Sequence, residues 1–166
     1  MTKTSSWLAL SALIVVVDQL AKYAVTRTFA VGEAVAVTPF FNLVLVYNPG
    51  AAFSFLSDQS GWQRVLFIAI ALAASAWIVY LLRKHPNQRL FALALSLVLA
   101  GALGNVIDRL LVGAVIDFAD FHAWGRHFPA FNVADSAITC GAITLAWDAL
   151  RPRRKDKGGR VKEGGV

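Results

Sequence analysis

The chain has 166 residues, of which 57 % are hydrophobic and only 16 % are charged, and its mean hydropathy is +0.59. This composition excludes an ordinary soluble globular protein and is typical of an integral membrane protein. The tail 151–166 holds seven Lys and Arg residues against two acidic residues, so it accounts for most of the net charge of +6. We expect residues 1–150 to form a single membrane domain. The basic tail is expected to be disordered and cytoplasmic, and we assign it no nucleic-acid binding.

Four apolar stretches are long enough to cross about 30 Å of hydrocarbon, which takes about 20 residues of helix. In chain order they are 7–28, 65–82, 90–109 and 132–150. The second stretch is uncharged, and the third is uncharged until Asp108 and Arg109 close it. The first stretch contains Asp18 and Lys22, and the last contains Asp135 near its start. The pattern predicts four transmembrane helices, two of which carry polar residues.

Basic residues in the flanks predict the orientation of these helices, because Lys and Arg stay on the cytoplasmic side. The tail and the three basic residues within 83–89 place both termini inside, so segments 29–61 and 113–130 face outward. A cleavable signal peptide is the alternative for the first stretch. The first A-x-A pattern that follows, at 34–36, already lies too far downstream, and we therefore expect a retained helix.

The outward segments are not ordinary linkers. Residues 40–47 are rich in Val, Phe and Leu and are followed by Asn48-Pro49-Gly50, which predicts a strand and a turn. Both faces of this strand are apolar, so we expect a small extracytoplasmic β-sheet that covers the bilayer surface or a substrate groove. The second segment has aromatic residues at Trp124, Phe128 and Phe131. Such residues favour headgroups, and they predict a membrane-surface loop or short helix. The expected fold class is an all-α membrane protein with four transmembrane helices and this small sheet.

Acidic residues beside hydrocarbon are costly and mark internal pairing or function. Asp18 and Lys22 lie four residues apart on one helix, so we expect a structural ion pair. Asp108 and Arg109 are interpreted as the polar end of the third helix, one turn after Asn105. Three acids have no basic partner nearby in the sequence: Asp117, Asp120 and Asp135.

Two carboxylates that meet where little water enters share one proton, which is the chemistry of an aspartic protease. From spacing alone this pairing is one hypothesis among several. A small proton or cation transporter, with Asp18, Asp108 and Asp135 along a path, is the alternative from another class. A binding or assembly subunit without chemistry is a third. The second stretch has no polar path, and this favours a single site over transport.

Other catalytic devices fit the sequence less well. Cys140 is the only cysteine and has no histidine near it in the sequence. A Ser/Lys dyad at Lys22 conflicts with the neighbouring Asp18, which would keep the amine charged. No His-Glu-x-x-His or phosphate-binding glycine pattern occurs. We expect no metal and no cofactor, and we interpret Gly101 and Gly104 as sites of close helix packing.

Five motifs follow one another along the chain. They are Asp18-Gln19-Leu20-Ala21-Lys22, Asn48-Pro49-Gly50-Ala51-Ala52-Phe53-Ser54, Gly104-Asn105-Val106-Ile107-Asp108-Arg109, Val115-Ile116-Asp117-Phe118 and Phe131-Asn132-Val133-Ala134-Asp135-Ser136. Taken together, they closely resemble the bacterial lipoprotein signal peptidase family, signal peptidase II. The resemblance covers nearly the whole chain and omits the tail and the stretch around Asp120.

The resemblance implies an inner-membrane aspartic endopeptidase with its active site at the periplasmic face. It would cleave signal peptides from diacylglyceryl-modified prolipoproteins just before the lipidated cysteine. Asp117 and Asp135 correspond to the catalytic pair, and Asp18 and Lys22 to a structural motif. The implied residues that bind substrate or support the pair are Asn48, Asn105, Asp108, Arg109 and Asn132.

Further partners implied by the resemblance are membrane lipids and cyclic peptide inhibitors of the globomycin type. No motif demands a second subunit, so a monomer is expected. Asp120 departs from the family pattern, and its proximity to Asp117 in the sequence suggests the hypothesis that it perturbs the catalytic pair.

Overall fold

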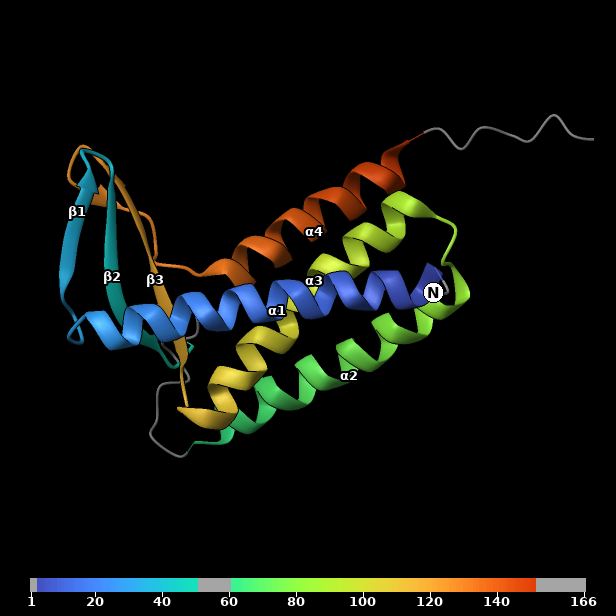
Figure 1. Ribbon diagram of the computed structural model, residues 1–166, viewed down its shortest axis with the longest axis horizontal. Helices are drawn as coiled ribbons and strands as arrows, with labels where there is room; N and C mark the ends of the chain where they lie inside the picture. The colour runs from blue at the N-terminus through green and yellow to red at the C-terminus, as the bar shows by residue number, and fades with distance from the viewer. Residues whose placement is uncertain (1–2, 51–60, 152–166) are drawn as a thin grey trace, which may run out of the picture.

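The computed structural model describes residues 3–50 and 61–151. Its elements are α1 (Lys3–Thr28), β1 (Ala34–Thr38), β2 (Phe41–Asn48), α2 (Trp62–Lys84), α3 (Arg89–Leu111), β3 (Val115–Ala123), β4 (Arg126–His127) and α4 (Val133–Leu150). Figure 1 shows the four helices side by side, with the sheet at one end of the bundle. All four are long and apolar enough to cross a membrane. The predicted membrane fold with a small β-sheet is confirmed, whereas the expected disordered tail lies almost entirely outside the described residues.

α3 is the central helix of the bundle. It packs against α1, α2 and α4, and more than half of its apolar window is buried, compared with about a fifth in the other three helices. The sequence permits this position because small residues recur along α3, among them Ala92, Ala100 and Gly101. Toward the end of the bundle where α2 connects to α3, Leu95 and Leu99 pack with Leu82 of α2.

Glycines let α4 and α1 approach α3 closely. A Cβ atom on Gly101 would overlap the backbone carbonyl oxygen of Ala134, and one on Gly104 would lie 2.7 Å from Asp18 Oδ2. A Cβ atom on Gly141 would lie 2.8 Å from the carbonyl oxygen of Ala94. The interpretation of Gly101 and Gly104 as sites of close packing is therefore confirmed.

The sheet is larger than the sequence suggests. Its four strands follow the order β1-β2-β3-β4, and every neighbouring pair is antiparallel. Segment 113–130, for which the sequence predicts a surface loop or short helix, instead supplies β3 and β4. β3 is rich in β-branched and aromatic residues, and its backbone groups pair with the edge that β2 would otherwise expose.

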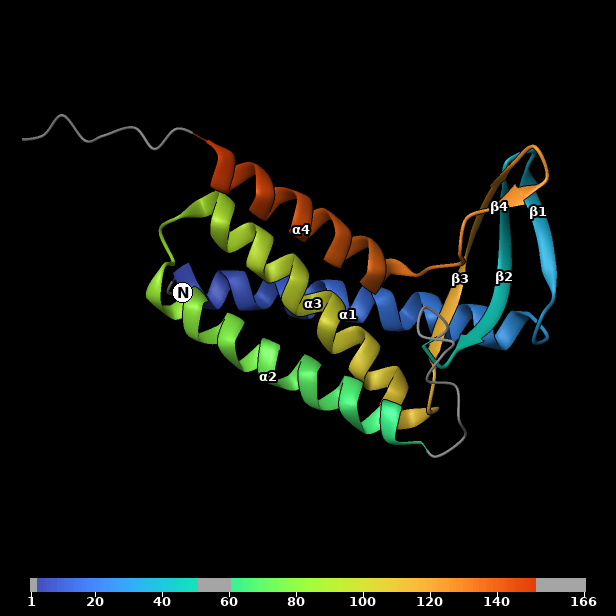
Figure 2. The ribbon, with the colours of Figure 1, turned by 180° about the vertical axis from the view of Figure 1, so that it is seen from behind.

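The sheet lies across the ends of α1 and α4 (Figures 1 and 2). Val25 of α1 packs with Leu45 of β2 and Ile116 of β3 in a small apolar cluster. This contact seats the strands on the bundle. β3 follows directly after α3 and leads through β4 to α4, so polar residues of these elements converge where the sheet meets the helices.

Replacing Gly101 by Ala is expected to destabilise the protein, because the new Cβ atom would overlap Ala134 and Ile138 of α4. Overpacking of this kind costs about 1–3 kcal/mol, so thermal unfolding in detergent should shift to lower temperature. Ala69→Val adds methyl groups at an exposed position of α2 and serves as the control. Equal melting temperatures for the two variants would contradict close packing of α3 on α4.

Candidate active site

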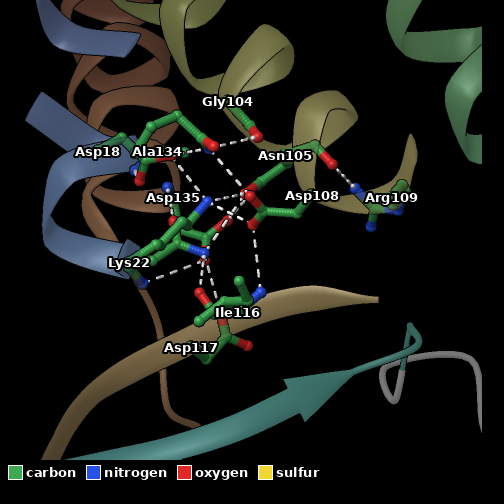
Figure 3. Close-up of polar contacts among 12 residues, drawn as sticks. Asp18, Lys22, Gly104, Asn105, Asp108, Arg109, Ile116, Asp117, Ala134 and Asp135 are labelled. Atoms are coloured by element: carbon green, nitrogen blue, oxygen red, sulfur yellow. Dashed lines mark hydrogen bonds and ion pairs between the residues drawn. The ribbon is translucent and has the colours of Figure 1, made fainter. Parts of the chain in front are cut away.

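Lys22 occupies the centre of a polar cluster between the helices and the sheet (Figure 3). Its Nζ lies 2.7 Å from Asp18 Oδ2 and 2.6 Å from Asp108 Oδ2, and it donates a hydrogen bond of 3.2 Å to Asn105 Oδ1. The three N–H donors of the ammonium are thus matched by three acceptors. Lys22 is only 1 % exposed. The expected ion pair with Asp18 is present, and Asp108 shares the cation.

Asp108 lies near the end of α3, as expected, and also joins this helix to two other elements. Its Oδ2 contacts Lys22 of α1 and accepts a hydrogen bond of 3.1 Å from the backbone N–H of Ile116 in β3. Its Oδ1 accepts a hydrogen bond of 2.9 Å from Gln19 Nε2. The carboxylate is buried, so these donors replace the water it has lost. Asp108 therefore fixes the start of β3 to the end of α3.

Asp18 holds the beginning of α4. Its Oδ1 accepts a hydrogen bond of 2.8 Å from the backbone N–H of Ala134, in the first turn of that helix. The first turn has unpaired N–H groups and a partial positive charge, both of which favour a carboxylate partner. Lys22 and Asp18 thus connect α1 to the segment that carries Asp135.

Asn132 lies between the two candidate catalytic aspartates. Its Nδ2 donates a hydrogen bond of 2.8 Å to Asp117 Oδ1, and its backbone N–H donates one of 3.3 Å to Asp135 Oδ2. Asn132 is also the N-cap of α4, and its Oδ1 accepts a hydrogen bond from the Asp135 backbone N–H. This capping box explains why α4 begins here, and it places both carboxylates beside one residue.

Asp117 is a buried carboxylate on β3. Only 1 % of the residue is exposed, and its Oδ2 accepts a hydrogen bond of 3.0 Å from Asn48 Nδ2 at the end of β2. Burial raises the pKa of Asp117 to about 6. The hydrogen bonds from Asn48 and Asn132 act in the opposite direction, while the negative charge of Asp135 adds to the rise. Asp117 can therefore hold or release a proton near neutral pH.

Asp135 has a different environment in the first turn of α4. Its Oδ1 accepts a hydrogen bond of 2.8 Å from Asn105 Nδ2, and its Oδ2 accepts the bond from the Asn132 backbone. Asp135 is half-buried, whereas Asp117 is buried. Both acids thus accept a hydrogen bond from Asn132, but Asp117 is more deeply buried than Asp135.

Arg109 lies at the edge of the cluster. Its Nη1 donates a hydrogen bond of 3.3 Å to the Asn105 carbonyl oxygen, and its Cζ lies 5.2 Å from the centroid of the Phe67 ring. The guanidinium is close enough to interact electrostatically with Asp135, Asp108 and Asp117. It brings a permanent positive charge to the site.

Asp120 belongs to a separate polar group on the sheet. It accepts a hydrogen bond of 2.8 Å from Asn42 of β2 and contacts His127 of β4 at 2.9 Å. Desolvation acts to raise the pKa of Asp120, but the hydrogen bonds from these two residues, together with the charges of His127 and His122, outweigh it and lower the pKa. Among the described residues, the groups that shift the pKa of Asp117 do not include Asp120. The hypothesis that Asp120 perturbs the pair is not supported.

The structure brings together every site residue that the sequence suggested. One set forms the hydrogen-bonded cluster, namely Asp18, Lys22, Asn48, Asn105, Asp108, Asp117, Asn132 and Asp135. Sequence reasoning gave no role to Gln19, whose amide spans Asp108 and the Gly104 carbonyl oxygen. A polar amide within an apolar helix was the signal that could have identified it. Within 3–50 and 61–151, no three His, Cys, Asp or Glu residues could hold a metal ion.

Comparisons with known proteins agree on one family. The family profile described as signal peptidase (SPase) II matches residues 10–151. The lipoprotein signal peptidase of Burkholderia vietnamiensis is 62 % identical over 145 residues, which cover 87 % of each chain. That of Janthinobacterium sp. (strain Marseille) is 57 % identical over 145 residues, covering 87 % of this chain and 88 % of the relative.

Solved structures give the same result. A bacterial membrane enzyme structure determined by the in meso method at 1.9 Å resolution is similar with a TM-score of 0.79 and 35 % identity, covering 89 % of this chain and 94 % of the other. A second, at 2.3 Å resolution, has the same TM-score and identity and covers 95 % of both chains.

Lys22→Met is expected to destabilise the protein by about 3–5 kcal/mol, because it leaves the carboxylates of Asp18 and Asp108 buried without their cation. Thermal unfolding in detergent measures the loss. Lys3→Met is the control, since Lys3 is exposed and donates to Asn87 at the other end of the bundle. An unchanged melting temperature for Lys22→Met would show that this cluster does not hold the fold together.

Proposed function

Because the chain belongs to the signal peptidase II family, we propose that it is an aspartic endopeptidase with Asp117 and Asp135 as its catalytic pair. The protein removes signal peptides from prolipoproteins and is a multi-pass membrane protein. The transporter alternative finds no support in its relatives.

The observation that carries the proposal is the position of Asn132 between the two carboxylates. One residue donates to Asp117 from its side chain and to Asp135 from its backbone. The acids come from a strand and from a helix, so neither local sequence nor helix geometry alone would bring them together. A shared donor supports two carboxylates that act on the same peptide bond.

The charges around the pair support a shared proton. Lys22 and Arg109 provide two positive charges, whereas four acids surround them: Asp18, Asp108, Asp117 and Asp135. With every acid ionised, the cluster would carry a net charge of −2 in a largely buried site. One proton on the pair reduces this imbalance. Asp117 is the acid whose pKa burial raises to about 6, so we place the proton mainly there.

The reaction then proceeds by general acid and base catalysis. Ionised Asp135 takes a proton from a water molecule as the water oxygen attacks the scissile carbonyl carbon. Asp117 donates its proton to the carbonyl oxygen, which gives a neutral tetrahedral diol. As the diol collapses, Asp135 donates its proton to the nitrogen, Asp117 takes a proton from one hydroxyl group, and the C–N bond breaks. The amine of the cysteine departs, and the pair returns to its starting protonation state. The products are a carboxylic acid and an amine, and one water molecule is consumed.

The supporting residues suit a peptide backbone. Arg109 can donate to a substrate carbonyl oxygen while its positive charge favours an ionised aspartate. Asn48 holds Asp117 through Nδ2, and Asn105 holds Asp135. Asp108, Asp18 and Lys22 keep these elements in place. No step requires a metal or an organic cofactor.

The substrate class follows from the depth of the site. A cysteine modified with diacylglyceryl keeps its acyl chains in the bilayer, and its peptide bond lies at the interface. The pair sits where the sheet meets the helix ends (Figure 3). The basic flanks favour cytoplasmic termini and therefore a periplasmic site in the inner membrane. A cyclic peptide of the globomycin type is proposed to occupy the same place, and the enzyme is proposed to act as a monomer.

Asp117→Asn and Asp135→Asn are each expected to reduce cleavage of a diacylglyceryl-cysteine peptide by at least about 10³-fold, because each removes one proton-transfer group. The assay uses purified protein in detergent, with circular dichroism to confirm folding. Asp120→Asn is the matched control three residues along β3, and it should stay within a few-fold of the original rate. Substantial cleavage by either of the first two variants would rule out the pair.

The pH dependence of kcat/KM should be bell-shaped. The general acid must be protonated, so activity is lost as the pH rises through the pKa of Asp117, about 6 in the free enzyme. The general base must be ionised, so activity is also lost at low pH. A kcat/KM that stayed flat from pH 5 to pH 8 would contradict Asp117 as the acid.

A further inference from the structure

Phe67, near the start of α2, contacts two separate parts of the site. Its ring lies against the backbone of Gly50, since a Cβ atom placed there would be 2.9 Å from the Phe67 Cε2 atom. The same ring has the Arg109 guanidinium 5.2 Å from its centroid, a distance typical of a cation–π contact. Gly50 follows β2 and Arg109 belongs to α3, so one side chain of α2 touches both neighbouring elements.

The first contact leads to Asp117. Gly50 has a φ of +117°, which only glycine adopts readily, and its backbone N–H donates a hydrogen bond of 2.9 Å to Asn48 Oδ1. The other end of the Asn48 amide donates to Asp117 Oδ2. Gly50 therefore contributes to the orientation of the Asn48 amide toward Asp117.

The second contact leads to Asp135. Arg109 donates to the Asn105 carbonyl oxygen, and Asn105 Nδ2 donates to Asp135 Oδ1. Arg109 is also close enough to attract the Asp135 carboxylate. A guanidinium held by an aromatic ring keeps its direction better than one on a free side chain, because fewer rotamers remain available.

We infer that Phe67 is a positioning residue of the peptidase. Its ring keeps the turn that follows Asn48 and the guanidinium of Arg109 in fixed positions relative to each other, and the two aspartates are aligned as a result. This inference rests on the proposed catalytic pair. Phe67 does not itself touch the reacting atoms in this arrangement. Phe67 is half-buried, so we expect loss of its ring to affect the alignment of the aspartates more than the stability of the fold.

The test compares Phe67→Leu with Phe67→Tyr. Leu keeps an apolar side chain and removes the ring, and we expect kcat to fall about tenfold with KM changed less than about twofold. Tyr keeps the ring and should retain kcat within about twofold. Phe91→Leu removes a ring from α3 near His85, at the other end of the bundle, and should leave kcat unchanged. Equal kcat for Phe67→Leu and Phe91→Leu would overturn the inference.

The pH profile gives a readout that simple loss of packing would not move. The Asn48 hydrogen bond lowers the pKa of Asp117, so a loosened Asn48 should raise it. In Phe67→Leu the alkaline limb of kcat/KM should therefore move to higher pH. An alkaline limb that stays in place while the melting temperature falls would show that Phe67 acts only through stability.

A double variant tests the route through the turn. If Phe67 acts partly through Asn48, then in an Asn48→Ala background Phe67→Leu should lower kcat by clearly less than tenfold. A tenfold loss of kcat in that background as well would overturn this route.

Asp117→Asn in the same assay separates the two proposals. Retained cleavage would refute the catalytic pair itself, whereas lost cleavage with an unimpaired Phe67→Leu variant would refute only the positioning role.

Discussion

The contact between the Lys22 ammonium and the carboxylates of Asp18 and Asp108 is the interaction on which the rest of the structure depends. A buried cation is tolerated only when charges and hydrogen bonds replace its water, and here the partners come from α1 and α3. The same two carboxylates then accept backbone N–H groups from α4 and β3. Four elements are thus joined by one cluster. The two elements that carry the candidate catalytic acids, β3 and α4, are both hydrogen-bonded to this cluster. The buried ion pairs therefore also position the site.

The two candidate catalytic aspartates have different surroundings, and the proposed division of their roles rests on this difference. Asp117 lies on a strand covered by the rest of the protein, and the loss of water raises its pKa to about 6. Asp135 lies at the start of a helix, where the N-cap residue and the first N–H groups favour a carboxylate. Asn132 donates a hydrogen bond to each of them. Assigning the acid to the strand and the base to the helix follows from this contrast, and so does the idea that a remote ring such as Phe67 can tune one acid through Asn48.

Much of the fold was predictable from the sequence, for a simple reason. Uncharged runs as long as 65–82 are typical of helices that cross hydrocarbon, and the motif order around Asp117 and Asp135 led to one family. The second outward segment was not predictable in the same way. Val115 to Ala123 is short and irregular in its polar pattern, and it becomes a strand because β2 offers it an edge. The role of Gln19 was missed because its partners, Asp108 and Gly104, are distant in the sequence.

By itself, the sequence determined that this is a membrane protein of four helices and which acids are candidates for catalysis, since hydropathy and motif order are properties of the chain alone. Only the tertiary structure decided how those acids differ. Burial, the shared Asn132, the contact of Asp108 with β3 and the separation of Asp120 from the pair all depend on distances between segments far apart in the chain. A pKa is set by local solvation and neighbouring charges, and these exist only once the sheet has closed over the ends of the helices.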